Sequence, residues 1–249
     1  MIRTALVLLF LATANFLGLP WLILWTWITG NPELMYRLSM KACRGAYLIA
    51  GVNVRMEGLE NIPPGPCIFV ANHASNLDPL ALMPRIPRLV SVLMKEDIFR
   101  IPVLSTGFRL VPFISVRRSD RESGVASFEA CRELLLKGIP VVIFPEGARS
   151  PDGRLRHFKK GAFVLGIDAR VPIVPVSISG TRALMLPGSR TIKPGNVTVR
   201  LGPAVDAAKY TSGQRAELTA RVEALVAAGL PPEQQPLATI AEAPEDPAE

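Results

Sequence analysis

Cysteine and histidine are both scarce in this sequence of 249 residues. Its three cysteines are Cys43, Cys67 and Cys131, and its two histidines are His73 and His157. The cysteines are odd in number, widely spaced and never part of a CxxC pair, which argues against a disulfide framework or a zinc site and fits a reducing compartment. Two histidines are too few for a histidine-rich metal site. We therefore expect no resident metal.

Acidic residues are fewer than basic ones, and both are unevenly distributed. The chain carries 28 Lys and Arg against 21 Asp and Glu, which gives a formal net charge of +7. Residues 85–160 alone have a net charge of +7, residues 161–200 contain a single acid, and residues 201–249 have a net charge of −5. A concentrated basic region attracts a nucleic acid, a membrane surface or a phosphorylated ligand. We predict no nucleic-acid partner, because the basic region has neither interleaved aromatic residues nor a known reader motif.

Charge is absent altogether from a long N-terminal segment. No charged residue occurs between Thr4 and Ile28. About 20 apolar residues suffice to cross a bilayer as a helix. Gly18 and Pro20 interrupt the run, however, so we expect either one span or two short helices that dip into one leaflet. A cleaved signal peptide is disfavoured, because the apolar character continues far beyond the small-residue site that resembles a cleavage point.

A helix with a basic stripe is expected directly after this segment. Arg37, Lys41 and Arg44 share one face of a helix over about 33–49. This face is either solvated or turned toward lipid phosphates at a membrane interface. By the positive-inside rule, the same charges place the active domain on the cytoplasmic side. We assign residues 1–50 to a membrane-associated helical segment with membrane lipids as its partners.

The rest of the chain is predicted to be one α/β domain over residues 51–230. The sequence is 49% hydrophobic, which excludes a disordered or collagen-like protein. Short apolar runs alternate with helical stretches over about 120–137, 161–169 and 212–229, which predicts a largely parallel sheet flanked by helices. The expected strands are 67–70, 89–93, 110–116, 141–144, 173–178 and 197–199. Residues 231–249 hold five prolines, five acids and no basic residue, and we expect a disordered tail there.

A histidine and an aspartate follow the first of these strands in the run NHASNLDP, residues 72–79. Asp78 is suited to the N-cap of a helix and Pro79 to its first position, so the carboxylate can turn back toward His73. A near-neutral imidazole that a carboxylate holds in one tautomer is a general base. The alternative is a capping aspartate beside an unrelated loop histidine.

Paired arginines end a second block. Residues 107–118 are expected to form a strand that ends in Arg117 and Arg118. The planar guanidinium group of arginine offers a fork of donors that matches phosphate oxygens. Solvated surface arginine is the commoner interpretation when this block is considered alone.

A third block places an acid, a glycine and an arginine after the strand over 141–144. Ligands collect at the carboxyl ends of strands in open α/β sheets. Glu146 or Arg149 can bond a polyol or phosphate there, and Gly147 permits close backbone approach. A plain turn is the alternative. The following run over 171–176, VPIVPV, carries two prolines and is expected to be an edge strand or bulge that packs in the core.

In this order and spacing, the motifs NHASNLDP, GFRLVPFISVRR, FPEGARS and VPIVPV closely resemble the 1-acyl-glycerol-3-phosphate acyltransferase family, over about residues 51–202. The resemblance implies transfer of a fatty acyl group to lysophosphatidic acid at a membrane surface, with acyl-CoA or acyl carrier protein as co-substrate and no resident cofactor. It implies that His73 is the base and Asp78 its partner. The positions that it assigns to acceptor binding are Arg118, Glu146 and Gly147. Ala148 departs from the threonine usual in the family, which leaves open what that hydroxyl contributes.

The implied reaction is direct acyl transfer. His73 would take the proton of a glycerol hydroxyl as that oxygen attacks the thioester carbonyl, and Asp78 would stabilise the imidazolium. No Cys or Ser lies in a nucleophile elbow, which disfavours a covalent acyl-enzyme. Two alternatives stay open. One is the same chemistry on glycerol-3-phosphate, another lysophospholipid or a lyso-aminolipid, and the other is a nonenzymatic membrane-tethered protein that binds anionic lipid.

Overall fold

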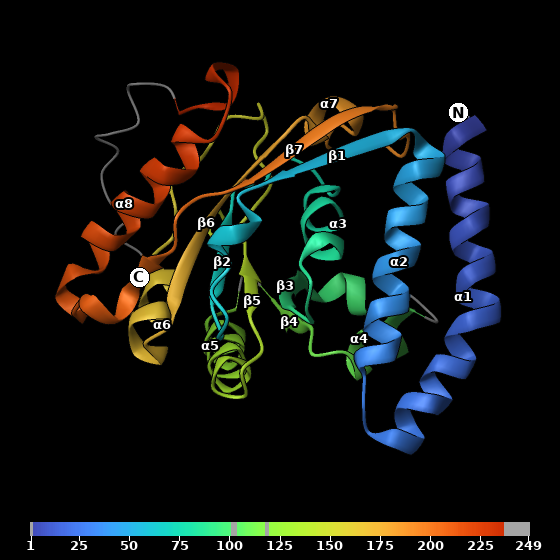
Figure 1. Cartoon of the computed structure of the whole chain (residues 1–249), viewed down its shortest axis with the longest axis horizontal. Coiled ribbons are helices and arrows are strands. Elements are labelled where there is room, and N and C mark those ends of the chain that lie inside the picture. The colour runs from blue at the N-terminus through green and yellow to red at the C-terminus, as the bar shows by residue number, and fades with distance from the viewer. Residues whose placement is uncertain (1, 101–103, 118–119, 237–249) are drawn as a thin grey trace.

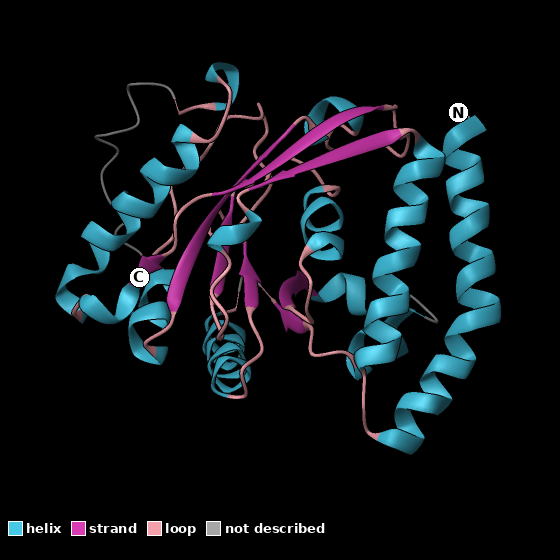
Figure 2. Ribbon diagram, viewed as in Figure 1, coloured by secondary structure: helices cyan, strands magenta, loops and turns pink. Residues whose placement is uncertain are grey.

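A mixed sheet runs through the middle of the protein (Figures 1 and 2). The computed structural model describes residues 2–100, 104–117 and 120–236. The strands are β1 Val52–Glu57, β2 Ile68–Ala71, β3 Ser91–Lys95, β4 Ile114–Val116, β5 Val141–Ile143, β6 Pro172–Ser179, β7 Gly195–Leu201 and β8 Val205–Asp206. They lie in the order β1-β7-β6-β2-β5-β3-β4, and β8 also pairs with β6. Only the pairings of β6 with β7 and β8 are antiparallel among the described strands, so the predicted largely parallel sheet is confirmed.

Helices cover both faces of this sheet (Figure 1). They are α1 Ile2–Thr29, α2 Glu33–Ala50, α3 Asp78–Leu82, α4 Leu104–Leu110, α5 Arg121–Leu136, α6 Gly161–Ala169, α7 Thr181–Leu184 and α8 Arg215–Ala228. The side chains of β2 show how the two faces are filled. Phe69 and Ala71 belong to the core that contains α1, α2 and α3, whereas Ile68 and Val70 belong to the core that contains α5, α6 and α8. This alternation follows from the two-residue period of a strand whose faces are both buried.

The N-terminal segment is one continuous helix, α1, with Pro20 inside it. It is long and apolar enough to cross a membrane, and it packs antiparallel to α2 at one side of the molecule (Figure 1). Its inner face holds the buried residues Val7, Leu19 and Thr26, while the rest is largely uncovered. The exposed large apolar residues of α1 are Ile2, Leu6, Leu8, Leu9, Phe16, Leu17, Trp21, Leu24, Trp25, Trp27 and Ile28.

Three helix predictions outside the N-terminal segment agree closely with the structure. Helix α6 has the predicted bounds, and α5 begins after the Asp120 N-cap, whose side chain accepts hydrogen bonds from the backbone N–H groups of Glu122 and Ser123. The helix predicted over 212–229 is a short 3₁₀ turn followed by α8, and Thr211 rather than Ser212 caps it through a capping box with Gln214.

One strand prediction was wrong, and the structure excludes one of the two alternatives given for another. Leu110 ends helix α4 and the following strand, β4, begins only at Ile114, so the described part of this block, residues 107–117, is the end of a helix, a turn and a short strand. Strand β6 is not at an edge, because it pairs with β2 on one side and with β8 and then β7 on the other. Pro175 is tolerated because it lies where the second side changes partner from β8 to β7, and its carbonyl still accepts from the Gly202 N–H at 2.8 Å.

Other differences lie at the boundaries of elements. Strand β1 was not predicted, and β3 is shifted two residues toward the C-terminus from the prediction of 89–93. The first residues of the predicted tail are ordered. Gln234 is buried, and its carbonyl accepts from the Leu155 N–H at 2.8 Å. The remainder of the tail, from residue 237, lies outside the described residues.

The sheet order brings several loops to one edge. Strands β6, β2, β5, β3 and β4 are neighbours in this order and run parallel. Their carboxyl ends therefore meet at the same edge of the sheet, where open α/β folds bind ligands. The His73 loop follows β2, and the Glu146 loop follows β5 directly beside it.

Candidate active site

His73 lies in the loop that leaves strand β2, with its side chain 11% exposed. Its ring packs against Phe144 with 4.5 Å between ring centroids. The preceding residue, Asn72, fixes the start of this loop, because its side chain donates to the Ile178 carbonyl at 2.9 Å and accepts from the Ile178 N–H at 2.7 Å. These two bonds continue the β2–β6 ladder beyond the end of β2, so the loop begins from a rigid point.

Asp78 is fully buried and faces His73. The carboxylate oxygen Oδ2 lies 2.8 Å from His73 Nδ1, and it also accepts from the backbone N–H groups of Ala74 at 2.8 Å and Ser75 at 2.7 Å. The contact between imidazole and carboxylate is the one that the spacing predicts. Asp78 is the first residue of α3 rather than its N-cap, and its side chain turns back to the loop.

The hydrogen bonds around Asp78 assign the tautomer of His73. Oδ2 accepts two backbone donors and Oδ1 accepts the Thr181 hydroxyl at 2.5 Å, so the side chain is surrounded by donors and acts as an ionised acceptor. The proton shared with His73 therefore belongs to Nδ1. Nε2 is left as the basic nitrogen, with no hydrogen bond to another residue in the described part of the chain. An imidazole in this state can accept a proton from a bound substrate.

The loop that follows the neighbouring strand, β5, holds the backbone of His73 in place through hydrogen bonds. The His73 N–H donates to Glu146 Oε1 at 2.8 Å, and the His73 carbonyl accepts from the Ser150 N–H at 2.7 Å. The backbone N–H and carbonyl groups of His73 are thus both held by one loop, through Glu146 and Ser150. The geometry gives Glu146 a positioning contact with the catalytic loop, and its role in acceptor binding stays a prediction.

Glu146 is itself an unusual carboxyl group. It is 4% exposed, and its Oε2 atom has no hydrogen-bond partner among the described residues. Burial raises the pKa of Glu146 to about 8, although the His73 N–H and the nearby Arg156 act in the opposite direction. Because the charged form is desolvated, the carboxyl group holds its proton close to neutral pH.

The other predicted site residues are placed differently. Gly147 adopts a φ of 73°, a left-handed conformation that favours glycine, and a β-carbon there would lie 3.2 Å from Lys159 Cε. Arg149 is partly buried in the same loop and forms no hydrogen bond or ion pair with His73, Asp78 or Glu146, while Ala148 is exposed. Arg118 lies outside the described residues.

Thr181 was missed by the sequence analysis. It is fully buried at the start of α7, and its hydroxyl donates a hydrogen bond to Asp78 Oδ1, the carboxylate oxygen that does not contact His73. Gly180, with a φ of 91°, turns the chain from β6 into α7. The available signal was a Gly-Thr pair after a buried apolar strand that was predicted to be parallel to the strand preceding His73. Strand ends of this kind share an edge.

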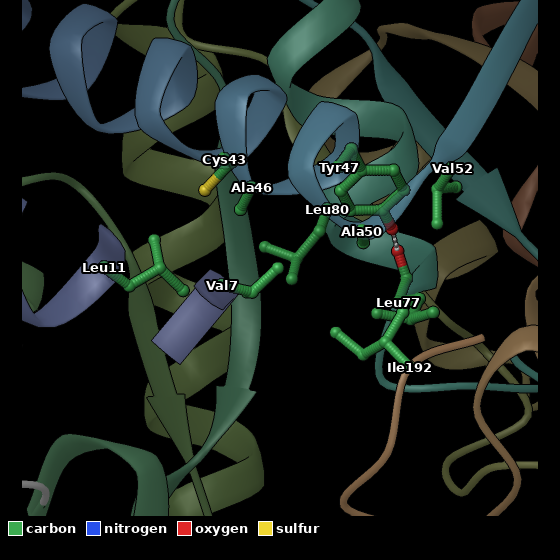
Figure 3. A pocket seen from close by; sticks show the side chains of 10 residues that line it. All are labelled: Val7, Leu11, Cys43, Ala46, Tyr47, Ala50, Val52, Leu77, Leu80 and Ile192. Carbon is green, nitrogen blue, oxygen red and sulfur yellow. Dashed lines mark hydrogen bonds between the residues drawn. The ribbon is translucent and has the colours of Figure 1, made fainter. Parts of the chain in front are cut away.

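An apolar cavity of about 70 Å³ lies between α1, α2 and the catalytic loop (Figure 3). Tyr47 and Leu77 border it, and the Tyr47 hydroxyl donates to the Leu77 carbonyl at 2.7 Å. The other lining residues shown in Figure 3 are Val7, Leu11, Cys43, Ala46, Ala50, Val52, Leu80 and Ile192. The lining of this cavity is almost entirely apolar, so it suits a hydrocarbon group rather than a polar one.

A second, more open pocket of about 390 Å³ lies at the carboxyl ends of β3 and β4. It is lined by Glu96, Phe99, Arg100, Arg109, Phe113 and Ser115. Glu96 is paired with Arg100 at 3.2 Å and with Arg117 at 2.8 Å, and these arginines lower the pKa of its carboxyl group. The pocket therefore presents guanidinium groups at the same edge of the sheet as His73.

A largely parallel sheet that presents a buried histidine–aspartate pair at the carboxyl ends of its strands is the architecture of an α/β enzyme. Residues 53–179 match the family model described as Acyltransferase. This match covers just over half of the chain and includes His73, Asp78 and Glu146, and the protein belongs to this acyltransferase family.

The chain is similar to proteins described as 1-acyl-sn-glycerol-3-phosphate acyltransferases. It is 37% identical over 183 residues to such a protein of Chlamydomonas reinhardtii, covering 72% of this chain and 54% of the algal protein. It is 31% identical over 180 residues to that of Pseudomonas aeruginosa, covering 72% of this chain and 69% of the bacterial protein. The chain spans about half the length of the algal and chloroplast relatives that it matches.

A solved structure shares the fold. The crystal structure of the 1-acyl-sn-glycerophosphate (LPA) acyltransferase of Thermotoga maritima matches with a TM-score of 0.74 and 28% sequence identity. The match covers 92% of this chain and 95% of that chain. The predicted fold class, an α/β acyltransferase domain with an N-terminal apolar helix, is confirmed.

Proposed function

We propose that this protein transfers a fatty acyl group from acyl-CoA or acyl carrier protein to the free hydroxyl of lysophosphatidic acid, which yields phosphatidic acid. The observation that carries the proposal is the His73–Asp78 pair, whose free nitrogen lies at the ligand-binding edge of a fold shared with proteins named for this reaction. The donor is a co-substrate, and no resident cofactor or metal is proposed.

The mechanism follows from the hydrogen bonds of the site. His73 Nε2 takes the proton of the acceptor hydroxyl while the oxygen attacks the thioester carbonyl, and Asp78 stabilises the imidazolium. The tetrahedral intermediate then collapses, the carbon–sulfur bond breaks, and the leaving thiolate receives the proton from His73. The ester is formed without a covalent acyl-enzyme.

The acceptor phosphate is proposed to bind the basic edge of the sheet. Arg109 and Arg100 line the open pocket beside β4, and Arg149 lies on the loop after β5. Arginine forks bind phosphate oxygens through paired hydrogen bonds. Arg118, Glu146 and Gly147 remain predicted acceptor-binding positions as well.

The membrane is proposed to contact the outer face of α1. This helix is tied to α2 near its start, where Arg3 Nη1 lies 3.4 Å from the Ala50 carbonyl, and to α4 in its middle, where Leu19 packs against Gly107. A span across the bilayer would carry the attached α/β domain into the hydrocarbon or pull α1 away from it. We therefore favour a helix that lies within one leaflet, with the active domain on the cytoplasmic face.

The test is acyl transfer by the purified full chain and by His73→Ala. With acyl-CoA and lysophosphatidic acid, the variant should release thiol at least about 10²-fold more slowly, which is the usual contribution of a general base. His157→Ala is the matched control, because His157 is the other histidine and is 69% exposed beside Glu223. It should keep full activity.

Three results would contradict the proposal. Equal activity of His73→Ala and the unchanged protein would exclude His73 as the base. Activity in neither would favour the nonenzymatic lipid binder. A panel of acceptors with one acyl donor, read by mass spectrometry, must show phosphatidic acid as the main product, and preference for glycerol-3-phosphate, another lysophospholipid or a lyso-aminolipid would reassign the acceptor.

A further inference from the structure

Residues 185–194, here called the 185–194 loop, connect α7 to β7 and have an unusual composition. The loop is apolar and basic, with Leu186, Ile192, Arg190 and Lys193 among its ten residues. It contains no acid, and none occurs anywhere between Asp168 and Asp206. Apolar residues combined with cations are typical of segments that bind at a membrane interface.

Hydrogen bonds tie this loop to two other parts of the molecule. At its start, the Met185 carbonyl accepts from the Ser75 hydroxyl at 2.9 Å, and Ser75 belongs to the catalytic loop. Near its end, the Ile192 N–H donates to the Thr4 hydroxyl at 3.2 Å, and Thr4 lies in the first turn of α1. The loop thus connects the catalytic loop to the beginning of the apolar helix.

Exposed side chains occur both in the 185–194 loop and at the start of α1. Leu186 is 50% exposed, and Arg190 and Lys193 are exposed and make no ion pair with the described residues. Ile2, at the start of α1, is 79% exposed. Pro194 and Arg3 both lie against Gly51, so the end of the loop adjoins the start of α1.

We propose that the 185–194 loop is a second membrane contact, in which Leu186 enters the interface and Arg190 and Lys193 bind the phosphate groups of anionic lipids. This inference rests on the proposed function, which places the outer face of α1 in the membrane. The partner is a bilayer rather than a soluble anion, because the two cations share the loop with an exposed leucine beside an apolar helix face.

The position of the loop has a consequence for substrate supply. Arg190 is five residues from Met185, so the chain can separate it from the catalytic loop contact by at most about 18 Å. A lipid phosphate bound at Arg190 is therefore held within about 18 Å of the contact between Met185 and Ser75. This contact keeps the neighbouring His73 near the membrane surface, where a lipid acceptor resides.

The first experiment measures insertion of Leu186. The full chain with Cys43→Ala and Leu186→Cys carries an environment-sensitive fluorophore and is mixed with vesicles of phosphatidylcholine, with or without phosphatidylglycerol. Cys67 and Cys131 are buried and stay unlabelled. The fluorophore should move to a dry environment on the anionic vesicles. The matched control is Leu136→Cys on α5, where the leucine is 64% exposed and should stay in water.

The second experiment measures how much Arg190 and Lys193 contribute to vesicle binding. The variant Arg190→Gln/Lys193→Gln should bind vesicles that contain phosphatidylglycerol about five-fold more weakly per charge removed, and should bind neutral vesicles as the unchanged protein does. The control Lys209→Gln/Arg215→Gln removes two exposed cations at the α8 side, away from α1 (Figure 1). It should leave anionic binding nearly unchanged.

The proposal fails if the fluorophore at position 186 stays in a water-exposed environment while the protein is bound to anionic vesicles. It also fails if the two double charge variants lose affinity for these vesicles to the same extent. Neither measurement requires catalysis. Thiol release in detergent micelles tests the proposed function separately, and there Arg190→Gln/Lys193→Gln should be as active as the unchanged protein. A chain that inserts Leu186 but transfers no acyl group would refute the proposed function and retain the membrane contact.

Discussion

At the scale of single residues, Asp78 determines what His73 can do. A fully buried carboxylate is costly unless donors surround it. Here two backbone N–H groups, the Thr181 hydroxyl and the imidazole N–H supply them. The backbone donors come with the loop, whereas Thr181 comes from a segment more than 100 residues away. This makes Thr181 the donor that a substitution can remove without altering the catalytic loop.

We predict that Thr181→Val lowers kcat about 10-fold to 100-fold, because a hydrogen bond to a buried charge contributes about 1.5–3 kcal/mol. Loss of this donor leaves Asp78 more negative toward His73, so the acidic limb of the kcat/KM profile should move to higher pH. Thr181→Ser keeps the hydroxyl and should restore both values. A loss of activity with an unmoved pH profile would show that Thr181 only supports the local packing.

The buried carboxyl group of Glu146 should make the free energy of unfolding depend on pH. Its pKa is raised to about 8 by burial, so the folded protein retains a proton that the unfolded chain has already released above about pH 4.5. The free energy of unfolding should therefore fall as pH rises from about 4.5 to 8, by up to about 1.4 kcal/mol per pH unit from this group.

Glu146→Gln should remove that slope, since a neutral amide has no proton to lose and its oxygen can still accept from the His73 N–H. Urea unfolding at several pH values in detergent solution measures the effect. The exposed Glu129→Gln is the control and should leave the slope unchanged. A slope that persists in Glu146→Gln would assign the titration to another group.

The sequence predicted part of this site and missed part of it for a physical reason. His73 and Asp78 are five residues apart, and the local turn between them, in which Asp78 accepts from the Ala74 and Ser75 N–H groups, brings them together. The contacts from Glu146 and Thr181 depend on strand order, since β5 and β6 lie on either side of β2. No local pattern encodes which strands are neighbours, so the contacts of Glu146 with His73 and of Thr181 with Asp78 could not be derived from the sequence.

At the scale of elements, the errors occurred where tertiary contacts override local preference. The apolar run over 107–113 resembles a strand, but Leu19 of α1 packs on Gly107 and the segment folds as α4. Strand β1 alternates Val52, Val54 and Met56 with polar residues, which is the pattern of a half-buried strand and was available in the sequence. The helices of the domain were predictable because their caps and apolar faces are local.

The turn between β6 and α7 gives a prediction at this scale. Gly180 has a φ of 91°, and a β-carbon there would lie 2.3 Å from the Asn196 carbonyl oxygen. Gly180→Ala should lower the free energy of unfolding by more than about 3 kcal/mol and reduce activity, because the turn positions Thr181.

Gly188 supplies the matched control for this turn. It has a φ of 82°, but no atom lies within 4 Å of a β-carbon built there. Gly188→Ala should therefore cost only the left-handed backbone strain, about 1–2 kcal/mol. Thermal unfolding of both variants separates the cost of backbone strain from the cost of the steric clash with Asn196. Equal losses of stability in the two variants would mean that the backbone around Asn196 moves to accommodate the added carbon.

At the scale of the whole molecule, the open question from the sequence was how α1 meets the bilayer. The helix is continuous and about 42 Å long, so it is long enough to cross. Sequence composition cannot separate a span from a helix lying in one leaflet, because both need the same apolar residues. The structure adds that the inner face of α1 packs on the domain from Val7 to Thr26, while the outer face is exposed along its whole length.

We therefore predict that the outer face of α1 lies at one depth in the membrane. Ile2, Leu17 and Ile28 are exposed by 79%, 62% and 70%, and they lie at the start, middle and end of the helix. Each is replaced by cysteine in the Cys43→Ala background, labelled with a fluorophore and quenched by lipids that carry nitroxides at different depths. A helix within one leaflet gives the same quenching profile at all three positions. A spanning helix would place Leu17 near the bilayer centre and the two isoleucines near opposite surfaces, and that result would require α1 to separate from α2 and α4.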